Sequence, residues 1–154
     1  MAVRSARRIL CVYPRYGGVS ITTFHYAYPL TDGVRAMMTP LGILVIAAYM
    51  PDTWEVRFVD ENISPASDAD FAWADAILVS GMHVQRPAII EIGRRARACG
   101  KPSVLGGPSV SSSPERYPEF DYLHVGELGD ATDAVISALD ADVSCPEEQR
   151  VFTT

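Results

Sequence analysis

Five short, mostly apolar segments constrain the fold of this chain more than any other feature. They lie at residues 9–13, 56–59, 76–79, 103–105 and 122–125, and glycine, proline or a polar turn follows each of them. Nearly continuous apolar runs of this length are typical of strands that are buried on both faces of a parallel sheet. The chain is therefore expected to form a parallel sheet rather than a set of hairpins.

Helical patterns lie between these segments, which supports the parallel sheet. Thr39 is expected to cap a helix with Pro40 at its first position, and residues 41, 44, 45 and 48 follow at the spacing of one helix face. Further helices are expected at residues 68–73, 87–100 and 131–139, whereas 109–121 can hold one turn at most. The pattern predicts a flavodoxin-like, doubly wound (Rossmann-like) α/β fold with three α/β/α layers and five strands in the order 2-1-3-4-5.

Length and composition fit one domain. The 154 residues, 48% of them hydrophobic, suit a single core. We expect an N-terminal tail at 1–8, a folded domain at 9–140 and a linker at 141–154. The net charge of −6 argues against a nucleic-acid partner, which would need a basic surface.

The location of the protein is predicted from two further features. The longest apolar run, residues 41–50, is too short for a transmembrane segment and is expected to form a buried helix. Three scattered cysteines, Cys11, Cys99 and Cys145, fit reduced thiols in a cytoplasmic protein.

Candidate binding residues follow the strands, where doubly wound sheets bind their ligands. They are Pro14 after the first strand, Ser80, Gly81 and Met82 after the third, Gly106, Gly107, Pro108 and Ser109 after the fourth, and Gly126 and Glu127 after the fifth. Each loop alone is equally typical of an ordinary turn, and Glu127 could instead cap the last helix. Together they predict a small-molecule site at one edge of the sheet.

The same loops contain no nucleophile paired with a base, and no metal-binding cluster is evident in the sequence. We therefore expect a bound cofactor rather than catalytic side chains. The long segment 17–38 carries Phe24, His25, Tyr26 and Tyr28. These aromatic residues could serve the site or pack on the flank of the domain.

Several of these motifs together resemble the cobalamin (B12)-binding domains that are fused to radical SAM enzymes. The resemblance rests on residues 39–49, 59–62, 80–86, 106–111 and 124–130. Residues 24–30 are similar to the hopanoid C-2 methylase-like subgroup of that family. The resemblance extends over about residues 8 to 140.

The resemblance implies that the domain holds cobalamin, with the nucleotide tail near residues 80–82 and 106–107. Many such domains supply a histidine to cobalt from an Asp-x-His-x-x-Gly motif, which is missing from residues 13–18 here. His25 and His83 are not expected to replace it. A following radical SAM domain in cis would hold the 4Fe-4S cluster and S-adenosylmethionine.

The function implied is that of the cobalamin-binding part of a methyltransferase, which uses methylcobalamin to methylate an unactivated carbon. This part alone is not expected to be catalytic. The alternative is a flavodoxin-like module for a flavin or a nucleotide. A phosphorylated receiver domain would need an aspartate at the end of the third strand, where Ser80 stands.

Overall fold

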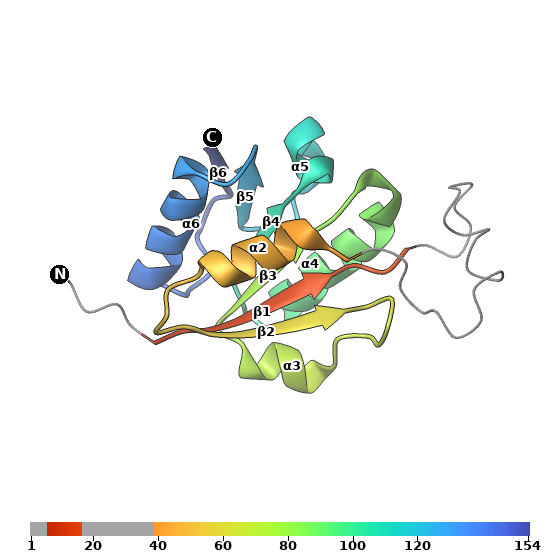
Figure 1. The fold of residues 1–154 in the computed structure, drawn as a ribbon, viewed down its shortest axis with the longest axis horizontal. Helices are drawn as coiled ribbons and strands as arrows, with labels where there is room; N and C mark the ends of the chain where they lie inside the picture. The colour runs from red at the N-terminus through yellow and green to blue at the C-terminus, as the bar shows by residue number, and fades with distance from the viewer. Residues whose placement is uncertain (1–5, 17–38) are drawn as a thin grey trace.

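A six-stranded parallel sheet forms the centre of the domain (Figure 1). The computed structural model describes residues 6–16 and 39–154. Within them the strand order is β2-β1-β3-β4-β5-β6. The strands are β1 (Arg8–Tyr13), β2 (Glu55–Asp60), β3 (Ala76–Ser80), β4 (Ser103–Gly106), β5 (Tyr122–Val125) and β6 (Arg150–Thr153).

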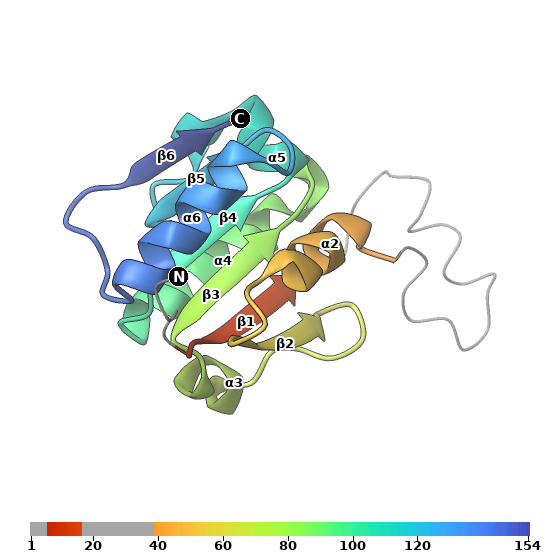
Figure 2. The ribbon, with the colours of Figure 1, turned by 60° about the vertical axis from the view of Figure 1, so that its left-hand side comes forward.

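Helices cover both faces of the sheet (Figure 2). One face packs against α2 (Leu41–Tyr49) and α6 (Asp130–Ala141). The other packs against α3 (Asp68–Trp73), α4 (Arg86–Ala98) and α5 (Pro108–Ser112). Two short 3-10 turns, η2 (His83–Gln85) and η3 (Pro114–Arg116), complete the described elements. The predicted doubly wound α/β fold with three layers is confirmed.

Alternate residues of each strand supply two separate apolar cores. On β1, Leu10 and Val12 face the core beneath α3 and α4, whereas Ile9 and Cys11 face the core beneath α2 and α6. All four side chains are fully buried. Burying a side chain of this kind stabilises the fold by about 1.5–3 kcal/mol. Burial also raises the pKa of the Cys11 thiol to about 12, which makes it a core residue rather than a reactive group.

The sheet has one strand more than the five predicted. The first five strands follow the predicted order, and β6 adds to the edge beside β5, with Leu123 opposite Val151. This strand has no continuous apolar run that would predict it, because an edge strand is not buried on both faces. Three of its four residues are exposed. The side chain of Gln149 holds its start by donating to the carbonyls of Tyr117 and Phe120.

Helix α2 also differs from the prediction. It begins at Leu41, with Pro40 rather than Thr39 at the N-cap and no side-chain cap. The expected buried face is largely exposed, because Leu41 and Val45 point outward and Ile43 is the buried residue. Its sequence is apolar on every side, so periodicity could not identify the face that meets the sheet.

The remaining helices follow from local sequence. Helix α3 has the predicted bounds, and its start is fixed by a capping box between Ser67 and Asp70. In α4, Gly93 allows close packing, since a Cβ there would lie 2.9 Å from Phe120 Cε2. These contacts hold the helices that carry the loops described next.

Candidate functional site

One row of residues crosses the carboxyl edge of the sheet on the face that α2 and α6 cover. The strand register places Tyr13 opposite Asp60, Ser80 opposite Gly106, and His124 opposite Phe152. The neighbouring pairs Val12–Val79 and Leu105–Leu123 align these three pairs into one line. We call its four central residues the rim row: Tyr13, Ser80, Gly106 and His124. Its two central positions carry the smallest side chains, with an aromatic ring on either side.

The loops after β3 and β4 approach each other closely at the centre of the rim row. Gly107 has a φ of +91°, and a Cβ there would lie 2.6 Å from Ser80 Oγ and 3.2 Å from the backbone nitrogen of Gly81. A side chain at this position would be both strained and crowded. Across from Ser80, Gly42 of α2 is also without a side chain, 4.0 Å from Ser80 Oγ to its would-be Cβ. Two residues without side chains, Gly42 and Gly107, therefore lie next to the hydroxyl of Ser80.

His124 forms the β5 side of the rim row. Its Nε2 lies 2.8 Å from the hydroxyl of Thr132 in α6, and the side chain is buried. Burial lowers the pKa of this imidazole, although its own backbone and the Glu127 carboxylate act in the opposite direction. A Cβ on Gly106 would meet the ring at ordinary contact distance, 3.8 Å from Nδ1. Because residue 106 is glycine, no side chain at that position covers this edge of the ring.

Two tyrosines form the opposite end of the rim row. The hydroxyl groups of Tyr13 and Tyr16 are 2.7 Å apart, and their rings meet edge to face at a centroid distance of 6.2 Å. Tyr13 is buried and Tyr16 is half-buried. The rim row therefore has a hydrogen-bonded tyrosine pair at one end and a histidine at the other.

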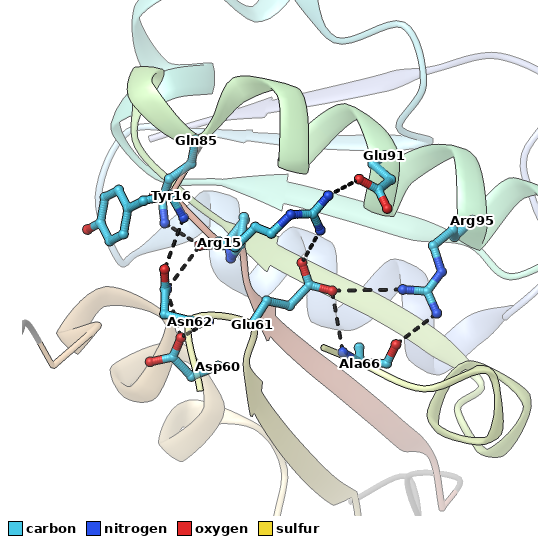
Figure 3. A network of polar contacts seen from close by, with 10 residues as sticks. Arg15, Tyr16, Asp60, Glu61, Asn62, Ala66, Gln85, Glu91 and Arg95 are labelled. Carbon is cyan, nitrogen blue, oxygen red and sulfur yellow. Dashed lines mark hydrogen bonds and ion pairs between the residues drawn. The ribbon is translucent and has the colours of Figure 1, made fainter. Parts of the chain in front are cut away.

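Next to this row, charged side chains form a polar network across the ends of β1 and β2 (Figure 3). Arg15 contacts Glu61 at 3.4 Å and also pairs with Glu91 of α4. Arg95 lies 3.8 Å from the same Glu61 carboxylate and 3.1 Å from Asp68. Burial raises the pKa of Glu61, and the backbone N–H of Ala66 and the two arginines only partly oppose this effect. The network ties the end of β1 to the rest of the sheet.

Two amide side chains complete the polar network by holding the loop after β1. Gln85 is fully buried; its amide donates to the carbonyl of Pro14 and its Oε1 accepts the backbone N–H of Met82. Asn62 also donates to the Pro14 carbonyl and accepts the backbone N–H of Tyr16 at 3.0 Å. Pro14 and Met82, both predicted site residues, are thus joined through Gln85.

The predicted residue Ser109 points to the other side of the β4 loop. Its buried hydroxyl lies 3.2 Å from His83 Nδ1 and contacts the hydroxyl of Tyr117. His83 in turn reaches Ser112 with Nε2 at 3.1 Å. Pro108 opens α5 and is exposed. Of the β4-loop candidates, Gly106 and Gly107 therefore lie at the rim row, and Ser109 is engaged within the protein.

Gly126 and Glu127 lie next to the end of β6. A Cβ on Gly126, which has a φ of +104°, would lie 3.3 Å from the side chain of Thr154. Thr154 donates its hydroxyl to the carbonyl of Glu127, and the Glu127 side chain is exposed. These two residues border the site through the loop that they form.

The loops were predicted from the sequence, whereas three residues that lie beside them in the structure were missed. Tyr13, His124 and the supporting Thr132 were not predicted to bind a ligand. The signal that could have found Tyr13 and His124 is strand alternation, because each stands two residues beyond a core residue, Cys11 and Tyr122. The predicted segment around His25 lies outside the described residues.

The described part of the chain has neither a metal-binding cluster nor a membrane-spanning helix. No group of three His, Cys, Asp or Glu side chains there is arranged to hold a metal ion. No helix in the same ranges has the length and apolar character that a membrane span needs.

Comparison with known proteins points to one family. Residues 29–136 match the model of the B12-binding family, described as "B12 binding domain". The chain is 61% identical over 151 residues to "Hopanoid C-2 methylase" of Rhodopseudomonas palustris (strain TIE-1), which covers 98% of this chain and 28% of that protein. It is 36% identical over 100 residues to "Uncharacterized methyltransferase sll1242" of Synechocystis sp. (strain ATCC 27184 / PCC 6803 / Kazusa), covering 62% of this chain and 19% of that protein. No solved structure matches the chain with significance.

Proposed function

The chain belongs to the B12-binding domain family, and we propose that it is the cobalamin-binding part of a B12-dependent radical SAM methyltransferase. The observation that carries the proposal is the 61% identity to the Rhodopseudomonas methylase along almost the whole chain. The name of that relative also favours a hopanoid as the methyl acceptor of the whole protein. Methylcobalamin, when bound, would supply the methyl group.

The residues of the rim row fit a cofactor with a bulky nucleotide tail. Gly106 leaves a position beside His124 that a Cβ would fill at ordinary contact distance. Ser80 contributes a hydroxyl at the same level, and within the described residues no hydrogen bond is made to it. Aromatic rings at both ends can cover a flat base, and the nearby hydroxyl, imidazole and backbone groups can bond to ribose and phosphate oxygens. We propose that Ser80, Gly106 and Gly107, with Gly81 and Met82 beside them, hold this tail.

The loop after β1 is not arranged to supply a ligand to cobalt. Arg15 stands where the histidine of an Asp-x-His-x-x-Gly motif would be, and it pairs with Glu61 and Glu91. Gln85 and Asn62 hold the adjacent Pro14 carbonyl. We propose that the cofactor binds without a protein histidine below the cobalt.

The remainder of the enzyme is a matter of proposal, because the chain spans about a quarter of the length of its Rhodopseudomonas relative. We propose that a radical SAM domain in cis supplies the 4Fe-4S cluster and S-adenosylmethionine. A cytoplasmic location stays a prediction.

The experiment that tests the proposal is a titration of the chain with hydroxocobalamin and methylcobalamin, followed by visible spectroscopy and gel filtration. We expect a red or orange species that elutes with the protein. With methylcobalamin, a blue shift of the visible band would indicate that the lower axial base has left the cobalt. A yellow species formed with a flavin, and none with a cobalamin, would favour the flavodoxin-like alternative.

Two variants make the titration specific for the site. Gly106→Val places a side chain next to His124 without demanding a left-handed backbone, and it should abolish co-elution. Gly100→Ala is the matched control, because Gly100 ends α4 with nothing within 4 Å of a would-be Cβ. Retention of colour by Gly106→Val as strong as that of the parent chain would contradict the proposed site.

A further inference from the structure

We propose that His124 is a specificity-determining residue: its ring offers a hydrogen-bond donor to the nucleotide tail, so that the domain prefers complete cobalamin to a corrinoid without the tail. The inference rests on the proposed function, because it assigns a role within the same site. It adds His124 to the site, a residue that the glycines and serines of the loops after β3 and β4 do not identify.

The position of His124 carries the first step. It follows Tyr122 and Leu123 on β5 and lies beside Gly106, with its ring on the face that α2 and α6 cover. The would-be Cβ of Gly106 lies 3.7 Å from the Cβ of His124 and 3.8 Å from Nδ1. A larger residue at position 106 would cover this edge of the ring. Because residue 106 is glycine, no side chain at that position covers Nδ1.

The second step is the tautomer of the ring. The hydroxyl of Thr132 accepts the backbone N–H of Gly129 at 3.3 Å and lies 2.8 Å from His124 Nε2. A hydroxyl has one hydrogen to donate, and with the Gly129 bond in place it can direct that hydrogen at Nε2. When Nε2 accepts this hydrogen, the ring proton resides on Nδ1. In this arrangement, which the inference adopts, the nitrogen next to Gly106 is the donor.

The third step is the charge of the ring. Burial lowers the pKa of His124, which favours the neutral ring near pH 7. Of the charged groups that act on it, Glu127 favours the protonated form but is exposed. A neutral Nδ1–H matches an uncharged or anionic acceptor. The ribose oxygens, the phosphate oxygens and the free base nitrogen of the tail are all acceptors of this kind.

A buried His–Thr pair could also serve only to fasten α6 to β5, and the experiment separates these roles. We would measure the affinity of the full chain for hydroxocobalamin and for hydroxocobinamide, which has the corrin ring but not the nucleotide tail. The variant His124→Phe keeps a ring of similar size and removes both nitrogens. Circular dichroism and thermal unfolding would establish that each variant folds.

We expect the parent chain to bind cobalamin more tightly than cobinamide. His124→Phe should weaken cobalamin binding about tenfold, the effect expected for one lost buried hydrogen bond, and leave cobinamide binding within about twofold. Thr132→Val should also weaken cobalamin binding, but by a smaller factor, because His124 keeps both nitrogens and loses only the hydroxyl that favours a proton on Nδ1. Thr132→Ser keeps that hydroxyl and should retain the preference of the parent chain.

The outcomes distinguish this inference from the proposed function. Equal losses for both ligands in His124→Phe, or no loss for either, would overturn the role of His124 while the cobalamin site stands. Equal affinity of the parent chain for the two ligands would do the same. If the folded parent chain bound neither ligand, the proposed function would fail and the inference with it.

Discussion

The two halves of the carboxyl edge of the sheet differ in the size and the contacts of their side chains. At β1 and β2 the polar network closes the edge with contacts among its own side chains: Arg15, Glu61, Asn62, Gln85, Glu91 and Arg95. At β3, β4 and β5 the rim row has the small residues Ser80 and Gly106 at its centre, and the imidazole of His124 lies beside Gly106. The difference teaches that this domain fixes one half of its edge with internal bonds, whereas the other half has small residues where we propose that the ligand binds.

We call the half of the edge at β1 and β2 the closed half and the half at β3, β4 and β5 the open half. The largest effect is expected in the open half at Gly107, because its close contact with Ser80 requires a residue without a side chain. Gly107→Ala adds a Cβ 2.6 Å from Ser80 Oγ on a residue with a φ of +91°. The left-handed backbone costs about 1–2 kcal/mol, and the crowding costs about 1–3 kcal/mol more. Urea unfolding should therefore show a loss of about 2–5 kcal/mol, accompanied by loss of cobalamin binding.

Gly100→Ala is the control that separates strain from crowding. Gly100 also has a positive φ, +64°, but nothing lies within 4 Å of its would-be Cβ. It should lose about 1 kcal/mol and bind cobalamin as the parent does. If the two alanine variants lost the same stability and both kept binding, close approach of the β3 and β4 loops would not be what defines the open half.

Substitutions in the closed half should lower the unfolding free energy by less, because its hydrogen bonds and ion pairs are shared among several partners. Gln85→Leu fills the same buried space but leaves the backbone N–H of Met82 without its acceptor. The carbonyl of Pro14 keeps the Asn62 amide as a donor. One buried, unsatisfied donor costs about 1–3 kcal/mol, and chemical denaturation should show a loss of about 2 kcal/mol.

Gln149 provides a matched amide outside the polar network. It also makes two hydrogen bonds, to the carbonyls of Tyr117 and Phe120, but it is exposed, so water can replace it. Gln149→Leu should therefore cost less than about 1 kcal/mol. A loss of unfolding free energy as large as that of Gln85→Leu would mean that burial of Gln85 does not strengthen its hydrogen bonds.

The two halves also differ in how far the sequence predicted them. Glycine and serine types at 80 and 106–107 identified the open half, because few other residues permit such close backbone approach. His124 was missed because its importance depends on strand register, which joins β4 to β5. Arg15 and Glu61 gave no local signal, since their contacts link β1, β2 and α4 across long stretches of chain. The face of α2 and the edge strand β6 were mispredicted for a related reason: burial there is set by neighbours, not by pattern.

The smallest effect, and the most informative about the closed half, concerns Glu61. Glu61→Gln keeps an oxygen for the Ala66 N–H and removes the charge that faces Arg15 and Arg95. Since each arginine keeps a second carboxylate, at Glu91 or Asp68, the change in unfolding free energy should stay below about 1 kcal/mol. The pH dependence of the difference in unfolding free energy distinguishes two effects on this carboxyl group, desolvation by burial and attraction to Arg15 and Arg95.

Burial raises the folded-state pKa of Glu61 above the ordinary 4.5, despite the arginines. Between these two pKa values the unfolded chain ionises while the folded chain keeps its proton, so the parent loses stability as the pH rises. Glu61→Gln cannot ionise and lacks this loss, whereas all other titrating groups are common to both chains. Urea unfolding of the pair at several pH values from 4 to 8 should show the variant gaining relative to the parent from pH 4.5 upward. The opposite trend would mean that attraction to Arg15 and Arg95 outweighs desolvation, and that the closed half is held together by charge rather than by its hydrogen-bonded amides.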